Sequence, residues 1–286
     1  MFIYFVLIFQ QLIASGTHII AKVVVKDIDP VSLTMLRSGI AAIALLLIMY
    51  IRRIKLQFER ADWKKIIFLS TLAIPINQFL FLYAIKYTTP ANAALLYATT
   101  PAMVLVLSII LGREKAILKR MIGIGIAFVG VLIVIFEKGV DVHADYTIAN
   151  VVIFVAVIAW ALYTIQGKEM ILKYGALKTS SSTMVIGTIL YLPIGAWNTI
   201  NFSYQSLTIY HWLGLLYLAI MTSIFAYVLW YYALSRIEAT RVTIFMNLQP
   251  VLTTLLSVLL LGQSITVAFV IGGVIALSGV IIAQGK

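Results

Sequence analysis

Ten apolar runs follow one another along this chain of 286 residues. A helix needs about 20 apolar residues to cross the roughly 30 Å of hydrocarbon in a bilayer, and each run meets that length. Continuous runs such as residues 40–51 lack the apolar/polar alternation of a transmembrane β-strand. We therefore predict an all-α integral membrane protein with ten transmembrane helices. The predicted spans are residues 2–22, 31–51, 64–85, 90–111, 117–136, 147–167, 179–199, 211–234, 239–261 and 265–283.

Composition excludes several classes of function. The chain is 63% hydrophobic and 11% charged, against about 45–50% and 25% in globular proteins. It has no cysteine, and His18, His143 and His211 are far apart, so we expect no disulfide and no metal site. The acidic residues lie in loops or at span ends rather than in catalytic pairs. We therefore expect no enzymatic activity, no catalytic residues and no cofactor.

One segment of the sequence occurs twice. Among the recurring residues, Tyr83, Pro101, Gly123 and Gly130 have matches 149 residues later, which are Tyr232, Pro250, Gly272 and Gly279. Repeats at about half the chain length are typical of secondary transporters. The expected halves are two five-helix repeats, residues 1–138 and 146–286.

The basic residues predict the orientation of these spans. Sixteen of the 21 lysines and arginines lie on the side that holds both chain ends, so both termini are expected in the cytoplasm. Residues 52–65 carry six basic residues, and their counterparts at 198–210 carry none. With five helices per half, this switch predicts that the second repeat is inverted relative to the first. Because the net charge of +11 follows loop positions, we do not expect nucleic-acid binding.

The motifs resemble those of the ten-helix EamA type of the drug/metabolite transporter superfamily. The resemblance covers essentially the whole chain and rests on three features: the repeated Tyr-Ala, Pro and Gly-Val strings, Arg37 in helix 2, and Trp160-Ala161 in helix 6. Helix 1 departs from the family pattern, because Ser15-Gly16-Thr17-His18 replaces Trp-Gly-x-Asn. The resemblance implies export or exchange of small metabolites such as amino acids. It also implies a central cavity lined by helices 1, 3, 4, 6, 8 and 9.

Polar residues at helical spacing mark candidate walls of such a cavity. Helix 1 carries Gln11, Ser15, His18 and Lys22 at spacings of 4, 3 and 4. Helix 9 repeats these spacings with Thr243, Asn247, Pro250 and Thr254. Such stripes face either a water-filled cavity or a hydrogen-bonded seam between helices.

Further cavity candidates come from the other predicted helices. They are polar or amphipathic side chains that a small solute contacts easily, namely Asn77, Phe81, Asn92, Tyr97, Thr99, Trp160, Tyr163 and Tyr227. Trp230 to Tyr232 lie close to the predicted cytoplasmic end of helix 8, where an interfacial aromatic belt is the favoured interpretation.

Proline, glycine and arginine give structural expectations. Pro101 and Pro250 leave the carbonyls of Tyr97 and Met246 without their usual donor, which predicts a hinge or a static kink. Arg37, near the external end of helix 2, either snorkels outward or holds an anion or a structural bond. Small-residue faces are expected to pack helix 5 against helix 10; they are Gly123, Ala127 and Gly130, and Gly272, Ala276 and Gly279.

These features predict a multi-pass transporter of the cell membrane. The expected cargo is a neutral, zwitterionic or weakly polar metabolite, with amino acids favoured, carried by export, facilitated diffusion or exchange through alternating access. Alternatives are multidrug efflux or a non-transporting scaffold or receptor. The spans hold no buried carboxylate for proton exchange, so His18 is the one candidate for proton coupling. We expect a monomer whose partners are the solute and the lipid bilayer.

Overall fold

The computed structural model describes residues 2–112, 117–136 and 145–284, and these residues form helices without any strand. Nine of the helices in the described ranges are long and apolar enough to cross a membrane, and Val267–Ala283 is a shorter apolar helix. The predicted all-α membrane fold is therefore confirmed. Much of the predicted 112–120 and 137–145 connections, with His143 and the ends of both predicted halves, lies outside the described residues.

The first half contains five apolar segments, two of which are composite. Its elements are α1 (Phe2–Val24), α2 (Pro30–Ile51), η1 (Arg60–Asp62), α3 (Trp63–Thr71), η2 (Leu72–Gln78), α4 (Phe79–Ile85), α5 (Pro90–Tyr97), α6 (Thr100–Ile110) and α7 (Leu118–Ile135). Pro30 and Pro90 each stand in the first turn of a helix, where a missing N–H costs nothing. Asp29 caps α2 by accepting from the backbone of Val31 and Ser32.

The second half follows the same order. Its elements are α8 (Asp145–Tyr174), α9 (Ala176–Asn201), η3 (Tyr204–Ser206), α10 (Ile209–Leu216), η4 (Tyr217–Ala226), α11 (Tyr227–Leu234), α12 (Ala239–Ile244), η5 (Phe245–Asn247), α13 (Leu248–Leu261) and α14 (Val267–Gln284). The break predicted between residues 167 and 179 is present but much shorter, because α8 continues to Tyr174 and α9 begins at Ala176, with only Gly175 between them, at φ +85°. Lys168 and Lys173 end the apolar run without ending α8, since lysine is a good helix former.

Two π-helical stretches interrupt the third and eighth spans. These are η2 and η4. Most residues of η2 have their counterpart, 149 positions later, inside η4. Pro75 lies inside η2 and supplies no backbone N–H. π-Helical turns are rare and frequently found at functional sites. Both stretches contribute side chains to the cavity described below.

Breaks also occur near the two predicted hinge prolines. Pro101 lies in the first turn of α6, directly after the break that separates it from α5. The Thr100 hydroxyl donates to the Tyr97 carbonyl at 2.6 Å, and so replaces the donor that Pro101 removes. Pro250 lies in the first turn of α13, after the 3₁₀ turn η5. Each proline therefore lies at the start of the second helical segment of its span.

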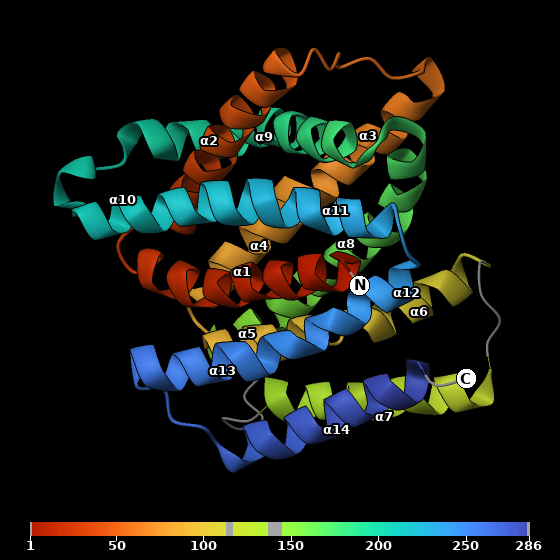
Figure 1. Ribbon diagram of the computed structural model, residues 1–286. Coiled ribbons are helices and arrows are strands. Elements are labelled where there is room, and N and C mark those ends of the chain that lie inside the picture. The colour runs from red at the N-terminus through yellow and green to blue at the C-terminus, as the bar shows by residue number, and fades with distance from the viewer. Residues whose placement is uncertain (1, 113–116, 137–144, 285–286) are drawn as a thin grey trace.

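Helices α7 and α14 lie side by side along one edge of the molecule (Figure 1). A Cβ added at Gly123 would lie 2.8 Å from the carbonyl oxygen of Gly279, and one added at Gly130 would lie 2.5 Å from that of Gly272. The two backbones therefore touch, as small-residue faces permit. The contacts run antiparallel, and each glycine pair is the other's counterpart at 149 residues' separation. Both helices lie away from the cavity.

The remaining helices build the body around α1. Helices α2 and α9 pack together toward the edge opposite α7 and α14 (Figure 1). Helix α1 contacts α13, η4, α11 and α5, so it lies among elements of both halves. Lys22 at its end donates to the carbonyls of Ile85, Lys86 and Thr88 at 2.7–3.0 Å. Lys22 therefore binds the carboxyl end of α4 and does not line the cavity.

Candidate functional site

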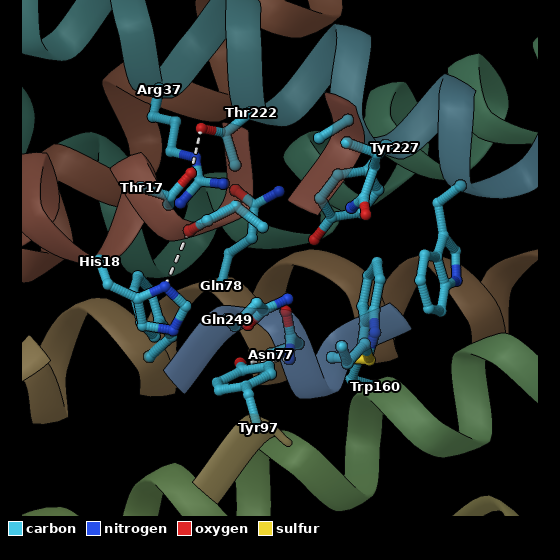
Figure 2. Close-up of a pocket in the computed structure, with 16 residues that line it drawn as sticks. Thr17, His18, Arg37, Asn77, Gln78, Tyr97, Trp160, Thr222, Tyr227 and Gln249 are labelled. Carbon is cyan, nitrogen blue, oxygen red and sulfur yellow. Dashed lines mark hydrogen bonds between the residues drawn. The ribbon is translucent and has the colours of Figure 1, made fainter. Parts of the chain in front are cut away.

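A cavity of about 80 Å³ is lined by elements from seven of the ten spans, and they come from both halves of the chain (Figure 2). This volume is the space open to the centre of a water-sized sphere, and about 10–15 Å³ of it holds one water. The cavity therefore has room for several waters or a small solute. Its lining residues are Gln10, Ala14, Thr17, His18, Arg37, Asn77, Gln78, Phe81, Tyr97, Trp160, Thr222, Ala226, Tyr227, Trp230, Met246 and Gln249.

Amide side chains form one part of the wall. Gln249 Nε2 donates to Gln11 Oε1 at 2.6 Å, and Gln11 Nε2 donates to Gln10 Oε1 at 2.6 Å. This chain joins α13 to α1. Asn77 Nδ2 donates to the Tyr97 hydroxyl and to the Ala156 carbonyl, both at 2.8 Å. The amides are thus held in place, while the buried Oε1 atoms of Gln78 and Gln249 have no partner among the described residues.

His18 belongs to a small aromatic group on one side of the cavity. Its ring lies edge-on to Phe81 and Tyr97, with centroids 5.3 and 5.7 Å away. His18 Nδ1 lies 2.8 Å from the Ala14 carbonyl, which accepts, so Nδ1 carries the proton. The buried Nε2 has no partner in the described part of the chain. It is therefore an acceptor available to a solute.

A larger aromatic cluster lies on the other side, where Figure 2 shows Trp160 and Tyr227 across from His18. Trp160 contacts Tyr227 edge-on at 5.1 Å between centroids, and Trp230 at 5.6 Å. Tyr163 stacks behind Trp160 at 5.4 Å. Trp230 Nε1 donates to Thr164 Oγ1 at 3.2 Å. The lining rings pack edge-on or tilted against one another and form an apolar wall, in which the Trp230 N–H has a hydrogen-bond partner.

The cavity also contains one permanent charge, on Arg37. This residue is 2% exposed, and its Nε donates to Ser223 Oγ at 2.8 Å. Of the alternatives for Arg37, outward snorkelling is wrong, because the residue lines the cavity, whereas the structural bond is present in the contact with Ser223. Beside it, the hydroxyls of Thr17 and Thr222 lie 2.7 Å apart.

The structure brings about half of the predicted cavity residues together. Six of them line the cavity, namely His18, Asn77, Phe81, Tyr97, Trp160 and Tyr227. Gln11 and Tyr163 do not line the cavity but contact residues that do, namely Gln10 and Trp160 respectively.

The other predicted residues lie elsewhere in the bundle. Asn92 donates to the Tyr146 hydroxyl, and Thr99 donates to the Leu96 carbonyl and borders a second, apolar cavity. Ser15 and Thr243 are buried, and Asn247 is half-buried, but none of the three lines the main cavity.

Sequence reasoning also missed several lining residues. They are Gln10, Thr17, Arg37, Gln78, Thr222, Trp230 and Gln249. A second polar stripe in helix 1, Gln10 and Thr17 at a spacing of 7, was a usable signal. The favoured interfacial position of Trp230 is wrong, since this side chain is fully buried. The π-helical stretches shift the side-chain register in helices 3 and 8, so a period of 3.6 does not identify their inner face.

Comparisons with known proteins agree with this architecture. An uncharacterized transporter of Bacillus subtilis, YyaM, is 30% identical over 286 residues, covering 99% of this chain and 93% of its own. An uncharacterized transporter of Archaeoglobus fulgidus is 29% identical, covering 96% of this chain and 95% of its own. One solved crystal structure superposes with a TM-score of 0.70 at 17% identity, over 97% of this chain and 94% of its own, and so shares the fold.

The family assignment rests on both parts of the chain. The model of the EamA-like transporter family matches residues 1–136 and 147–284. These ranges include every residue that lines the cavity. The chain therefore belongs to the EamA-like transporter family, within the drug/metabolite transporter superfamily.

Proposed function

We propose that the protein is a secondary transporter that moves small polar or zwitterionic metabolites, with amino acids as the favoured class, through this cavity by alternating access. The observation that carries the proposal is the origin of the cavity wall. Four pairs of lining residues stand 149 positions apart, one member in each half: Asn77 and Ala226, Gln78 and Tyr227, Phe81 and Trp230, and Tyr97 and Met246. A solute at this place touches equivalent positions of both halves.

The antiparallel contact of α7 with α14 supports an inverted repeat. In that contact Gly123 meets Gly279, and Gly130 meets Gly272, so exchanging each residue for its counterpart returns the same pairs. Such self-complementary contacts belong to a two-fold axis. Inverted repeats place the solute near the membrane midplane, where one repeat rocks against the other. In this account both termini lie in the cytoplasm.

The chemistry of the lining favours metabolites over cationic drugs. Amides, hydroxyls and the Arg37 guanidinium are present, and no carboxylate is among the lining residues that the structure describes. Export of lipophilic cations in exchange for protons uses a buried carboxylate that alternates between the two. The cavity therefore suits polar solutes that carry no net positive charge.

Solute flux into proteoliposomes tests the proposal. Purified protein is reconstituted, and uptake of labelled amino acids, sugars and nucleotides is followed against protein-free vesicles. We expect at least one small polar solute to equilibrate faster with protein than without it. A protein that is folded and correctly inserted, yet moves nothing in the panel in either direction, contradicts the proposal.

A further inference from the structure

The guanidinium of Arg37 is the feature that says most about the solute. A guanidinium has five N–H donors and stays protonated in proteins. Among the described residues, Arg37 makes one hydrogen bond, from Nε to Ser223 Oγ. Ser223 in turn donates to the Leu218 carbonyl at 3.1 Å. Ser223 is thus a fixed, neutral support that aims the guanidinium and leaves its charge uncompensated.

Electrostatics makes this arrangement costly without an anion. A buried charge is expensive unless it is paired. In the described ranges, Arg37 forms no ion pair, and the ion pairs that occur there lie near helix ends, such as Lys173 with Asp62 and Lys65 with Glu169. Ionisable groups inside a membrane bundle mark solute pathways when they face a cavity, and Arg37 does so.

The groups around Arg37 suit a carboxylate. The hydroxyls of Thr17 and Thr222 line the cavity next to it, and Figure 2 shows the Arg37 side chain running toward them and toward Gln78. Guanidinium binds carboxylate through two parallel N–H···O bonds, which adds geometric specificity to the charge. The Thr17 hydroxyl donates to the Ile13 carbonyl at 2.9 Å and the Thr222 hydroxyl to Thr17 at 2.7 Å, so the donors that meet a carboxylate here are those of the guanidinium. One part of the cavity therefore matches a carboxylate in both charge and shape.

The opposite part of the cavity suits an apolar body. The aromatic side chains of Trp160, Tyr227 and Trp230 line it there, and Met246 adds a flexible apolar side chain. Tryptophan and tyrosine bind amphipathic solutes through their broad surfaces. Charge at one end and rings at the other define an orientation for the solute. The second half does not repeat the charge, since the counterpart of Arg37 there is Ile186.

We propose that Arg37 anchors the carboxylate of the solute, so that the cavity selects amphipathic carboxylates, including zwitterionic amino acids, over the corresponding amides and amines. This inference rests on the proposed transport function and names its substrate class. A purely structural Arg37 would stabilise the helices equally for every solute. The two roles therefore differ in whether removing the guanidinium changes selectivity.

Equilibrium binding to the detergent-purified protein tests the proposal with four probes that share a phenyl ring: phenylacetate, L-phenylalanine, phenylacetamide and 2-phenylethylamine. Titration calorimetry measures affinity, and thermal stabilisation is the second readout. We expect the two carboxylates to bind about tenfold or more tightly than the amide and the amine, as for hydrogen bonds to charged groups. Equal binding of carboxylate and amide by the parent protein overturns the anchor.

Variants separate the anchor from a structural role. Arg37→Gln is expected to weaken carboxylate binding about tenfold while leaving amide binding nearly unchanged, and Arg37→Lys to restore part of the preference. Ser38→Ala, on the same helix and outside the cavity, is the matched control for helix 2. If Arg37→Gln does not fold, the parent preference and Arg37→Lys decide. Equal loss for all probes in Arg37→Lys contradicts the proposal.

The outcomes also separate this inference from the transport proposal. If the protein moves an amide or an amine but neither carboxylate, the transport proposal stands and the proposed role of Arg37 is wrong. Carboxylate binding that depends on Arg37, without flux of any panel solute in proteoliposomes, would leave the anchor but remove the transport function.

Discussion

The Nε of Arg37 in α2 donates to Ser223 Oγ in η4, across 186 residues of sequence and at a distance of 2.8 Å. The bond joins the two halves next to the cavity. Because Ser223 belongs to a π-helical stretch, its position depends on an irregular backbone rather than on a regular helical face. The proposed solute site is thus coupled to the geometry of η4, where a change of helical register would move the Arg37 guanidinium.

Ser223→Ala is expected to lower the stability of the protein. The substitution leaves Arg37 Nε without an acceptor in a buried place, which costs about 1–3 kcal/mol. Thermal unfolding of the purified protein, followed by size-exclusion chromatography after heating, measures the shift. Ser38→Ala on the neighbouring helix is the control, since its hydroxyl donates only within its own helix, to the Met35 carbonyl. Equal unfolding temperatures for parent and Ser223→Ala would show that this bond contributes little.

Single cysteines test the inversion, and the natural sequence supplies a cysteine-free background. Gln57 and Ser206 are exposed and stand 149 residues apart. An inverted repeat places these counterparts on opposite sides of the membrane. A membrane-impermeant maleimide applied to intact cells is expected to label Ser206→Cys but not Gln57→Cys. Labelling of both from outside contradicts the inverted arrangement.

Two glycines of α7 separate backbone contact from helix propensity. A Cβ at Gly130 would lie 2.3 Å from the Ala276 nitrogen, whereas a Cβ at Gly125 meets nothing within 4 Å. Gly130→Ala is therefore expected to destabilise by about 1–3 kcal/mol through overpacking. Gly125→Ala is expected to be neutral or stabilising by up to about 1 kcal/mol, since alanine favours helix. The same heating experiment measures both, and a more harmful Gly125→Ala would contradict the packing of α7 on α14.

Substitutions in helix 9 test which face serves the solute. Gln249 lines the cavity and bonds Gln11, while Asn247 lies outside the lining. Gln249→Ala is expected to weaken solute affinity by about 2- to 13-fold, the effect of one hydrogen bond. Asn247→Ala is expected to change it less. The measurement is the concentration dependence of flux at equal amounts of folded protein, and a reversed order would restore the Asn247 face predicted from sequence.

His18 tests energy coupling. It shares the cavity with the titratable groups Arg37 of α2, Tyr97 of α5 and Tyr227 of α11, and no carboxylate is among the described lining residues. We expect solute flux to follow the solute gradient and to be indifferent to an imposed pH gradient, in the parent and in His18→Gln. Proteoliposomes with and without a pH gradient measure this. Proton-driven accumulation that disappears in His18→Gln would identify His18 as the coupling group.

Regular helices were the part of the structure that sequence predicted well. The spans follow from hydropathy because lipid demands it, and the small-residue faces of α7 and α14 meet where the glycine spacing places them. The ends of helices were predicted less well from the sequence, as the continuation of α8 to Tyr174 shows. Hydropathy marks where lipid ends, and a helix continues past that point when its residues favour it.

The cavity was harder to predict for a physical reason. A polar stripe on one helix does not say which neighbour it faces, so Asn92 turned toward Tyr146 and Gln11 toward Gln249. The inner faces of helices 3 and 8 depend on the π-helical register of η2 and η4, which contribute Gln78 and Thr222. Arg37 was recognised as important, but only the packing of α2 against η4 decides that it points inward.

Exchange across a sealed membrane tests the central account most directly. Proteoliposomes are loaded with an excess of unlabelled L-phenylalanine, and a trace of the labelled compound is added outside, with L-phenylalaninamide in parallel. Alternating access through a carboxylate-selective cavity predicts a transient accumulation of labelled phenylalanine that requires the internal load, is absent for the amide and is strongly reduced in Arg37→Gln. Entry of tracer that does not depend on the internal load, at equal rates for both compounds and for both proteins, would contradict the account.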